Sequence, residues 1–132
     1  MKPLNPSPRI TEAESEVMKL LWQKEPLSAS EIIEKLTEQM SWSDQTVKTF
    51  LNRLHKKNAI RFEKSGRTYL YYPLVSHDDY LKAENKSFLN RFYDGAVGML
   101  CAKFLEEEKL SDRDIEQLQR LLDQRKKDGS GA

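Results

Sequence analysis

The stretch SWSDQTVKTFLNRLHKK, residues 41–57, has the pattern of an amphipathic helix with an unusual distribution of charge. Its apolar side chains recur at helical spacing, which predicts a helix that begins after Ser43 or Asp44 and ends near Asn58. The apolar stripe consists of Val47, Phe50, Leu51 and Leu54. No acidic residue occurs from Gln45 to Phe62, although acids elsewhere in the chain recur about every five residues. The side opposite the stripe therefore carries only neutral and positive groups.

The face opposite the stripe is rich in groups that hydrogen-bond nucleic acid. A rotation of about 100° per residue places Gln45, Thr49, Asn52 and Lys56 at its centre, with Thr46, Lys48 and Arg53 at its margins. Amides, hydroxyls and cations bind base edges and phosphates, whereas phosphates repel carboxylates. We predict contacts at or near base edges for Gln45, Thr46, Lys48, Thr49 and Asn52, and phosphate contacts for Ser43, Arg53 and Lys56. Taken alone, the helix is more simply explained as a solvated surface.

Two further helices are predicted on the N-terminal side of this stretch. Thr11 and Glu14 have the spacing of a capping box, and they begin a helix at about 11–24. Ser28 and Glu31 repeat the spacing and begin a second helix that ends before Trp42. The stretch is therefore expected to be the third helix of a compact helical unit.

On the C-terminal side, the apolar period shortens from about 3.6 residues to two, which predicts two β-strands joined at Ser65-Gly66. The tip of this hairpin is basic, with Lys64 and Arg67 placed to contact phosphates. Three helices followed by a basic hairpin is the order of a winged helix-turn-helix, in which the third helix enters the major groove of DNA. Winged helices also bind proteins, so a protein-interaction module without operator specificity is the alternative.

The last part of the chain returns to helical periodicity and carries a large apolar surface. Gly95 and Gly98 indicate a break between two helices, and Ser111 begins a last one. A second copy of the chain would cover this surface, which predicts a homodimer that binds a palindromic operator in double-stranded DNA. The predicted dimerisation residues are Leu81, Phe88, Leu89, Phe92, Tyr93, Val97, Leu100, Phe104, Leu118, Leu121 and Leu122.

The predicted fold class is mainly α with a small β-hairpin wing. Its expected parts are a flexible arm at 1–9, a winged-helix DNA-binding domain at 10–75, a three-helix dimerisation domain at 76–127 and a disordered tail at 128–132.

Composition narrows the class of protein further. The net charge is only +1, but residues 41–72 hold seven basic against two acidic residues, whereas residues 76–132 hold ten against twelve. No apolar run has the length of a membrane span or a signal peptide, so we expect a cytoplasmic protein with no membrane insertion. One cysteine and two histidines favour neither a disulfide framework nor a metal site. No phosphate loop or nucleophile arrangement indicates an enzyme, and no cofactor is predicted.

Several segments resemble the BlaI/MecI/CopY family of bacterial transcriptional repressors, of the penicillinase repressor type. They are TEAESEVMKLLW, WSDQTVKTFLNRLHKKNAI, YLYYPLV and FLNRFYDGAVGMLCAKFLEEEKLSDRDIEQLQRLL, in this order over nearly the whole chain. The resemblance implies a homodimer that represses transcription from palindromic operators with TACA and TGTA half-sites. In the antibiotic-responsive members, repression is relieved by proteolysis of the dimerisation region, after a membrane sensor has detected a β-lactam.

Two departures from the family concern how repression is relieved. The family is cut at an Asn-Phe bond, which corresponds here to Lys103-Phe104, so the phenylalanine matches and the asparagine is missing. The cysteine-rich motif of the copper-responsive members is absent from the tail QRKKDGSGA. Cys101 is expected to be a buried small apolar side chain, with a redox role as the alternative.

Overall fold

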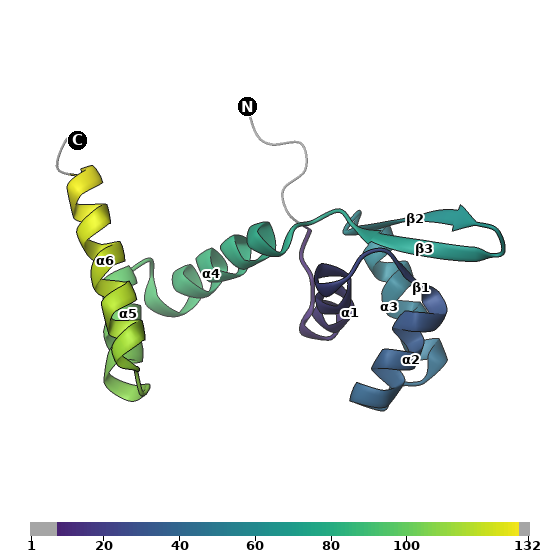
Figure 1. The fold of residues 1–132 in the computed structure, drawn as a ribbon, viewed down its shortest axis with the longest axis horizontal. Coiled ribbons are helices and arrows are strands. Elements are labelled where there is room, and N and C mark those ends of the chain that lie inside the picture. The colour runs from purple at the N-terminus through teal and green to yellow at the C-terminus, as the bar shows by residue number, and fades with distance from the viewer. Residues whose placement is uncertain (1–7, 130–132) are drawn as a thin grey trace. The chain divides into compact units, whose positions relative to one another are not determined.

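The computed structural model describes residues 8–129 (Figure 1). The ends of the predicted arm and tail, residues 1–7 and 130–132, lie outside the described residues. The described part is mainly helical with a small sheet, so the predicted fold class is confirmed. Its elements are α1 (Glu12–Gln23), β1 (Leu27–Ser28), α2 (Ala29–Met40), α3 (Asp44–Lys56), β2 (Ile60–Ser65), β3 (Thr68–Pro73), α4 (His77–Tyr93), α5 (Val97–Glu107) and α6 (Asp112–Gly129).

The two predicted capping boxes are present and set where α1 and α2 begin. The Thr11 hydroxyl accepts a hydrogen bond from the Glu14 amide at 3.1 Å, and the Glu14 carboxylate accepts one from the Thr11 amide at 3.0 Å. Ser28 and Glu31 make the same reciprocal pair at the start of α2, again at 3.1 and 3.0 Å. These bonds satisfy amides that would otherwise lack partners in the first turn of each helix.

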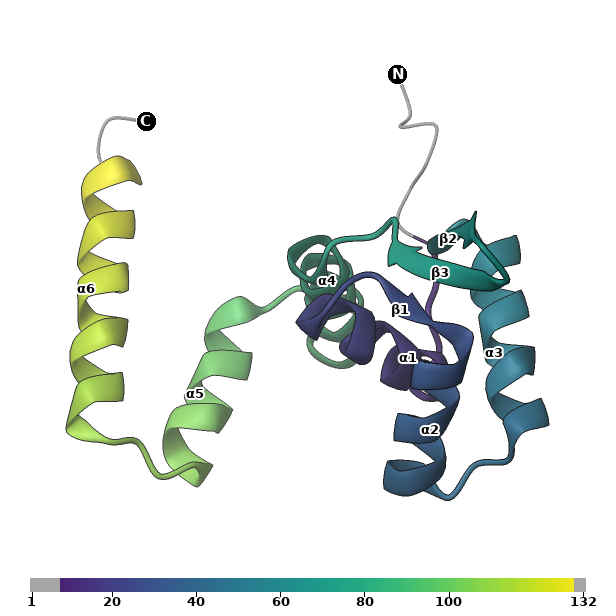
Figure 2. The same ribbon diagram turned by 45° about the vertical axis from the view of Figure 1, so that its right-hand side comes forward.

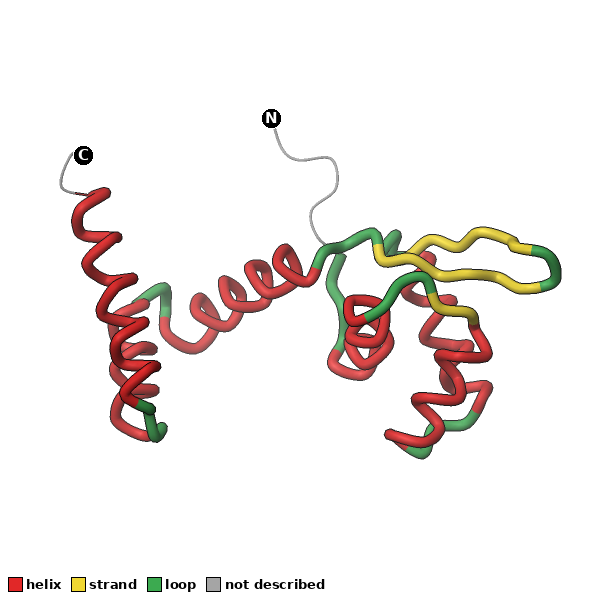
Figure 3. Tube along the Cα trace, in the orientation of Figure 1, coloured by secondary structure: helices red, strands yellow, loops and turns green. Residues whose placement is uncertain are grey.

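The sheet contains one strand that the sequence did not indicate. The β2–β3 hairpin pairs antiparallel with Phe62 opposite Tyr71, and β1 pairs antiparallel with the other edge of β3. Because β1 is only two residues long, it has no alternating pattern of its own. The hairpin turns at Gly66, whose φ of +64° suits the first position of a tight two-residue turn. In Figures 1 and 3 the hairpin extends past the helices beside it.

The hydrophobic core of the N-terminal part of the chain lies between helices α1, α2 and α3 and the base of the sheet. The predicted stripe of α3 faces inward, with Val47, Leu51 and Leu54 buried. Helices α2 and α3 lie side by side and are joined by a short turn (Figure 2). The remaining buried apolar residues are Ile10, Val17, Met18, Leu20, Leu21, Leu27, Ile32, Leu36, Ala59, Ile60 and Val75.

The chain divides into two compact units between Asn85 and Lys86, inside α4. The first turns of α4 belong to the N-terminal unit because aromatic contacts hold them there. Trp22 of α1 donates a hydrogen bond to the Val75 carbonyl at 2.8 Å, and its ring stacks on His77 with 4.8 Å between centroids. The division thus falls ten residues after position 76, where the sequence suggested that a second domain begins.

The C-terminal unit leaves its apolar side chains uncovered. Helices α4, α5 and α6 contain no buried residue within the described chain. Helices α5 and α6 line an apolar groove of about 380 Å³ that includes Cys101, Phe104, Ile115, Leu118 and Leu122. The prediction that Cys101 is buried is wrong, because its side chain is exposed in this open groove.

Two smaller features complete the description of the fold. Helix α6 extends through Asp128 and Gly129, which were expected to belong to the tail. No helix among residues 8–129 has the length and apolar character needed to span a bilayer.

Candidate nucleic-acid interface

Helix α3 presents the polar face that its sequence predicts. Gln45, Lys48, Asn52, Arg53 and Lys56 are exposed, and Thr46 and Thr49 are partly exposed. The Thr49 hydroxyl donates to the Gln45 carbonyl within the helix, at 2.9 Å, so its lone pairs remain available as acceptors. The face therefore offers amide, hydroxyl, ammonium and guanidinium groups with no carboxylate among them.

Ser43 has a structural role in addition to its predicted contact with phosphate. It is the N-cap of α3, and its hydroxyl oxygen accepts a hydrogen bond from the Thr46 amide at 3.1 Å. The same oxygen lies 2.9 Å from the Thr46 hydroxyl. The side chain is exposed and lies at the positive end of the helix dipole, so the region around Ser43 attracts anions.

The other end of α3 is held by an ion pair that sequence reasoning missed. Lys57, the C-cap residue of α3, pairs with the buried carboxylate of Glu14 in α1 and donates to the Arg9 carbonyl at 2.9 Å. Burial alone would raise the pKa of Glu14. Hydrogen bonds from Lys57 and Thr11, with the charge of Lys57, outweigh burial and hold that pKa below its usual value of 4.5. Lys57 is thus committed to the fold, whereas its neighbour Lys56 faces outward.

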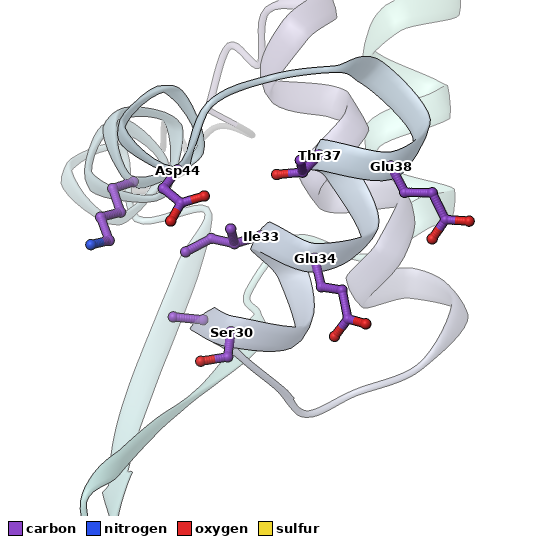
Figure 4. A pocket seen from close by; sticks show the side chains of 8 residues that line it. Ser30, Ile33, Glu34, Thr37, Glu38 and Asp44 are labelled. Carbon is purple, nitrogen blue, oxygen red and sulfur yellow. The ribbon is translucent and has the colours of Figure 1, made fainter.

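A hollow of about 650 Å³ lies between α2 and α3, and acidic side chains of both helices line it. In Figure 4, Ile33 and Thr37 of α2 point toward Asp44 of α3, while Glu34 and Glu38 point away from α3. Lys48 of α3 also lines this hollow. The acidic side chains beside this part of α3 therefore belong to α2 and to the first residue of α3.

The wing adds positive charge beyond the end of α3. Lys64 and Arg67, which flank the turn at Gly66, are both exposed. The wing touches α3 through His55 and Phe62, whose rings lie 4.9 Å apart between centroids. This contact lies at the base of the hairpin, and the two wing cations lie further along it, at the turn.

These features define a winged-helix DNA-binding protein. The sequence profile of the family described as penicillinase repressor matches residues 10–124. The chain belongs to this family, as the resemblance in its sequence indicated, and the family is one of transcriptional repressors rather than enzymes.

Relatives in the family match the chain over nearly its full length. The penicillinase repressor of Bacillus licheniformis is 39% identical over 119 residues, which are 90% of this chain and 93% of that protein. The methicillin resistance regulatory protein MecI of Staphylococcus aureus strain N315 is 37% identical over 121 residues, which are 92% of this chain and 98% of that protein.

Solved structures match the N-terminal unit. The DNA-binding domain of the repressor BlaI superimposes with a TM-score of 0.52 and 39% identity, covering 61% of this chain and 94% of that domain. The monomeric form of Bacillus licheniformis BlaI, in complex with the blaP half-operator, matches with a TM-score of 0.51 and 40% identity, covering 55% of this chain and 89% of that chain. The winged-helix prediction is therefore confirmed.

Proposed function

We propose that this repressor binds a palindromic operator as a homodimer, with one α3 helix in the major groove of each half-site. The observation that carries the proposal is the acid-free outward face of α3, where Gln45, Asn52 and Lys56 are exposed together. Lys64 and Arg67 extend the same positive character along the wing. A relative of this chain has been solved on a half-operator, which supports the same use of the fold here. Operator binding in turn implies a cytoplasmic protein.

The residues assigned to DNA divide into two groups with different expected effects. Gln45, Thr46, Lys48, Thr49 and Asn52 are proposed to lie at or near base edges, and Ser43, Arg53, Lys56, Lys64 and Arg67 at phosphates. Losing a base contact reduces discrimination between sequences. Losing a phosphate contact weakens every duplex and lowers the dependence of affinity on salt by about one unit of slope.

Binding to a symmetric duplex with TACA and TGTA half-sites, compared with a scrambled duplex over a salt series, tests this function. We expect a large preference for the symmetric duplex. Asn52→Ala should reduce that preference, whereas Arg53→Ala should weaken both duplexes alike and flatten the salt dependence. Equal affinity of the unchanged protein for both duplexes would instead favour a winged-helix protein-interaction module without operator specificity.

The dimer is proposed from the uncovered apolar surface of the C-terminal unit. Phe92 is 63% exposed, Leu121 58% and Leu122 68%, although such side chains are usually buried. A patch of this kind on a soluble chain marks an interaction surface, and a second copy supplies a matching one by symmetry. Light scattering at micromolar concentration should show twice the mass of the 15.4 kDa chain.

Relief of repression is proposed to follow cleavage of the Lys103-Phe104 bond in α5 by a sensor-linked protease. Support comes from the family pattern around this bond, in which Phe104 matches. Fragments mapped after β-lactam challenge of a host that carries the family's sensor should end at Lys103. Lys103→Asn restores the asparagine of the family pattern and should speed the cut, whereas an intact chain under challenge would oppose the proposal.

A further inference from the structure

The two faces of the wing differ in charge and in chemistry. Directly opposed residues of an antiparallel pair lie on the same face, so the pair of Phe62 with Tyr71 shares a face with the pair of Lys64 with Tyr69. Glu63 lies on the other face, together with Arg61. Those two form an ion pair at 2.7 Å, and Arg61 also lies over the Tyr72 ring at 4.0 Å. The only acid of the hairpin is thus neutralised on the face that lacks Phe62.

The face that carries Phe62 is the one turned toward α3. The His55 ring of α3 lies 4.9 Å from the Phe62 ring, and the Tyr69 ring meets Phe62 edge-on at 5.3 Å. Three rings therefore run from the C-terminal part of α3 along the wing toward Lys64. They continue the polar face of α3 outward, because His55 follows Asn52 by one helical turn.

These rings remain accessible although large aromatic side chains usually seek burial. Phe62 is 43% exposed and Tyr69 is 45% exposed. Neither side chain is needed to close the core, since the buried residue of this strand face is Ile60. The corner between α3 and the wing thus presents two open apolar rings beside a lysine.

A nucleic acid strand matches this combination of rings and cations. Its backbone alternates apolar sugar C–H groups with anionic phosphates, and it borders the major groove that α3 would enter. Lys64 on the ring face and Arg67 at the turn provide charge for phosphates, and this face of the hairpin carries no carboxylate.

We propose that the rings of Phe62 and Tyr69 pack against deoxyribose groups of the DNA strand that lies in the corner between α3 and the wing. This contact rests on the proposed function, because it requires α3 in the adjacent major groove. It adds affinity that does not depend on base sequence or on salt, since it buries apolar surface and releases no counterions.

Hydroxyl-radical footprinting combined with affinity measurement tests the contact. Phe62→Ala should weaken binding to symmetric and scrambled duplexes by the same factor, about tenfold for one buried ring. Its salt slope should equal that of the unchanged protein, and sugars protected beside the half-site should become reactive. Lys64→Ala should lower the salt slope by about one. Leu74→Ala, which removes a 51% exposed side chain elsewhere on the same unit, should change none of these quantities.

Two results would overturn the sugar contact. One is an unchanged affinity and footprint in both Phe62→Ala and Tyr69→Ala. The other is a loss of affinity accompanied by a lower salt slope, because the rings would then only hold the wing cations in place. Tyr69→Ala tests the same contact in case Phe62→Ala impairs folding. Thermal unfolding of each variant is measured alongside binding. If the unchanged protein binds both duplexes equally, operator specificity fails, yet the sugar contact is still measured on either duplex.

Discussion

Two adjacent lysines at the end of α3 have different environments, so they are expected to have different roles. Lys57 pairs with buried Glu14, whereas Lys56 is exposed on the outward face. Lys57→Met should lower the free energy of unfolding by about 2 kcal/mol, because it leaves a buried carboxylate without its cation while the lysine itself is partly solvated. Lys56→Met, the matched control, should leave stability nearly unchanged and weaken DNA binding. Chemical denaturation and duplex titration of both variants check the prediction, which fails if the two variants behave alike.

The acid stability of the N-terminal unit should depend on Glu14. Its pKa in the folded protein lies below the usual value of 4.5, so the ionised carboxylate stabilises the fold above that pH. This stabilisation is lost as the pH falls through the folded-state pKa, because both states are then protonated. Glu14→Gln should therefore be less stable near neutral pH but lose less stability on acidification below about pH 4.5. Thermal unfolding across this range, with exposed Glu12→Gln as control, measures the difference; parallel curves for all three proteins would contradict it.

At the scale of elements, capping of α3 and contact with DNA can be separated at Ser43. Ser43→Ala removes the cap and should cost about 1 kcal/mol of stability. Ser43→Asp keeps a good cap but adds a negative charge, so it should retain stability and lose affinity for every duplex, most at low salt. Calorimetry and binding at two salt concentrations distinguish the effects. Unimpaired binding by Ser43→Asp would remove this residue from the phosphate contacts.

At the scale of the whole molecule, operator affinity should depend on residues far from α3. Leu122→Glu places a charge in the apolar surface of the C-terminal unit and should yield a 15.4 kDa monomer in light scattering. Such a monomer should bind a half-site as before but lose most affinity for the full operator, because two linked contacts become independent. Gln117→Glu adds the same charge about 140° around α6 and should remain dimeric. A dimeric Leu122→Glu protein would exclude this surface from the dimer interface.

The sequence by itself determined the local elements and the chemistry of the α3 face. Capping boxes act over three residues and apolar stripes over one or two helical turns, so Thr11, Ser28 and the stripe that includes Val47 were sufficient to place the first three helices. The acid-free segment from Gln45 to Phe62 contains most of this third helix, and helical geometry alone placed the polar residues of that helix on one surface. These signals are local, and local rules can be applied without knowledge of the fold.

Only the tertiary structure decided which partners are joined across long separations in the chain. The Glu14–Lys57 pair spans 43 residues and the Trp22–Val75 hydrogen bond spans 53, and neither leaves a local pattern. The pairing of β1 with β3, the contact of His55 with Phe62 and the exposure of Cys101 were likewise invisible, because each depends on which elements pack together. Burial and pairing are properties of the packed chain, so Lys56 and Lys57 became distinguishable only after α1 and α3 had been brought side by side.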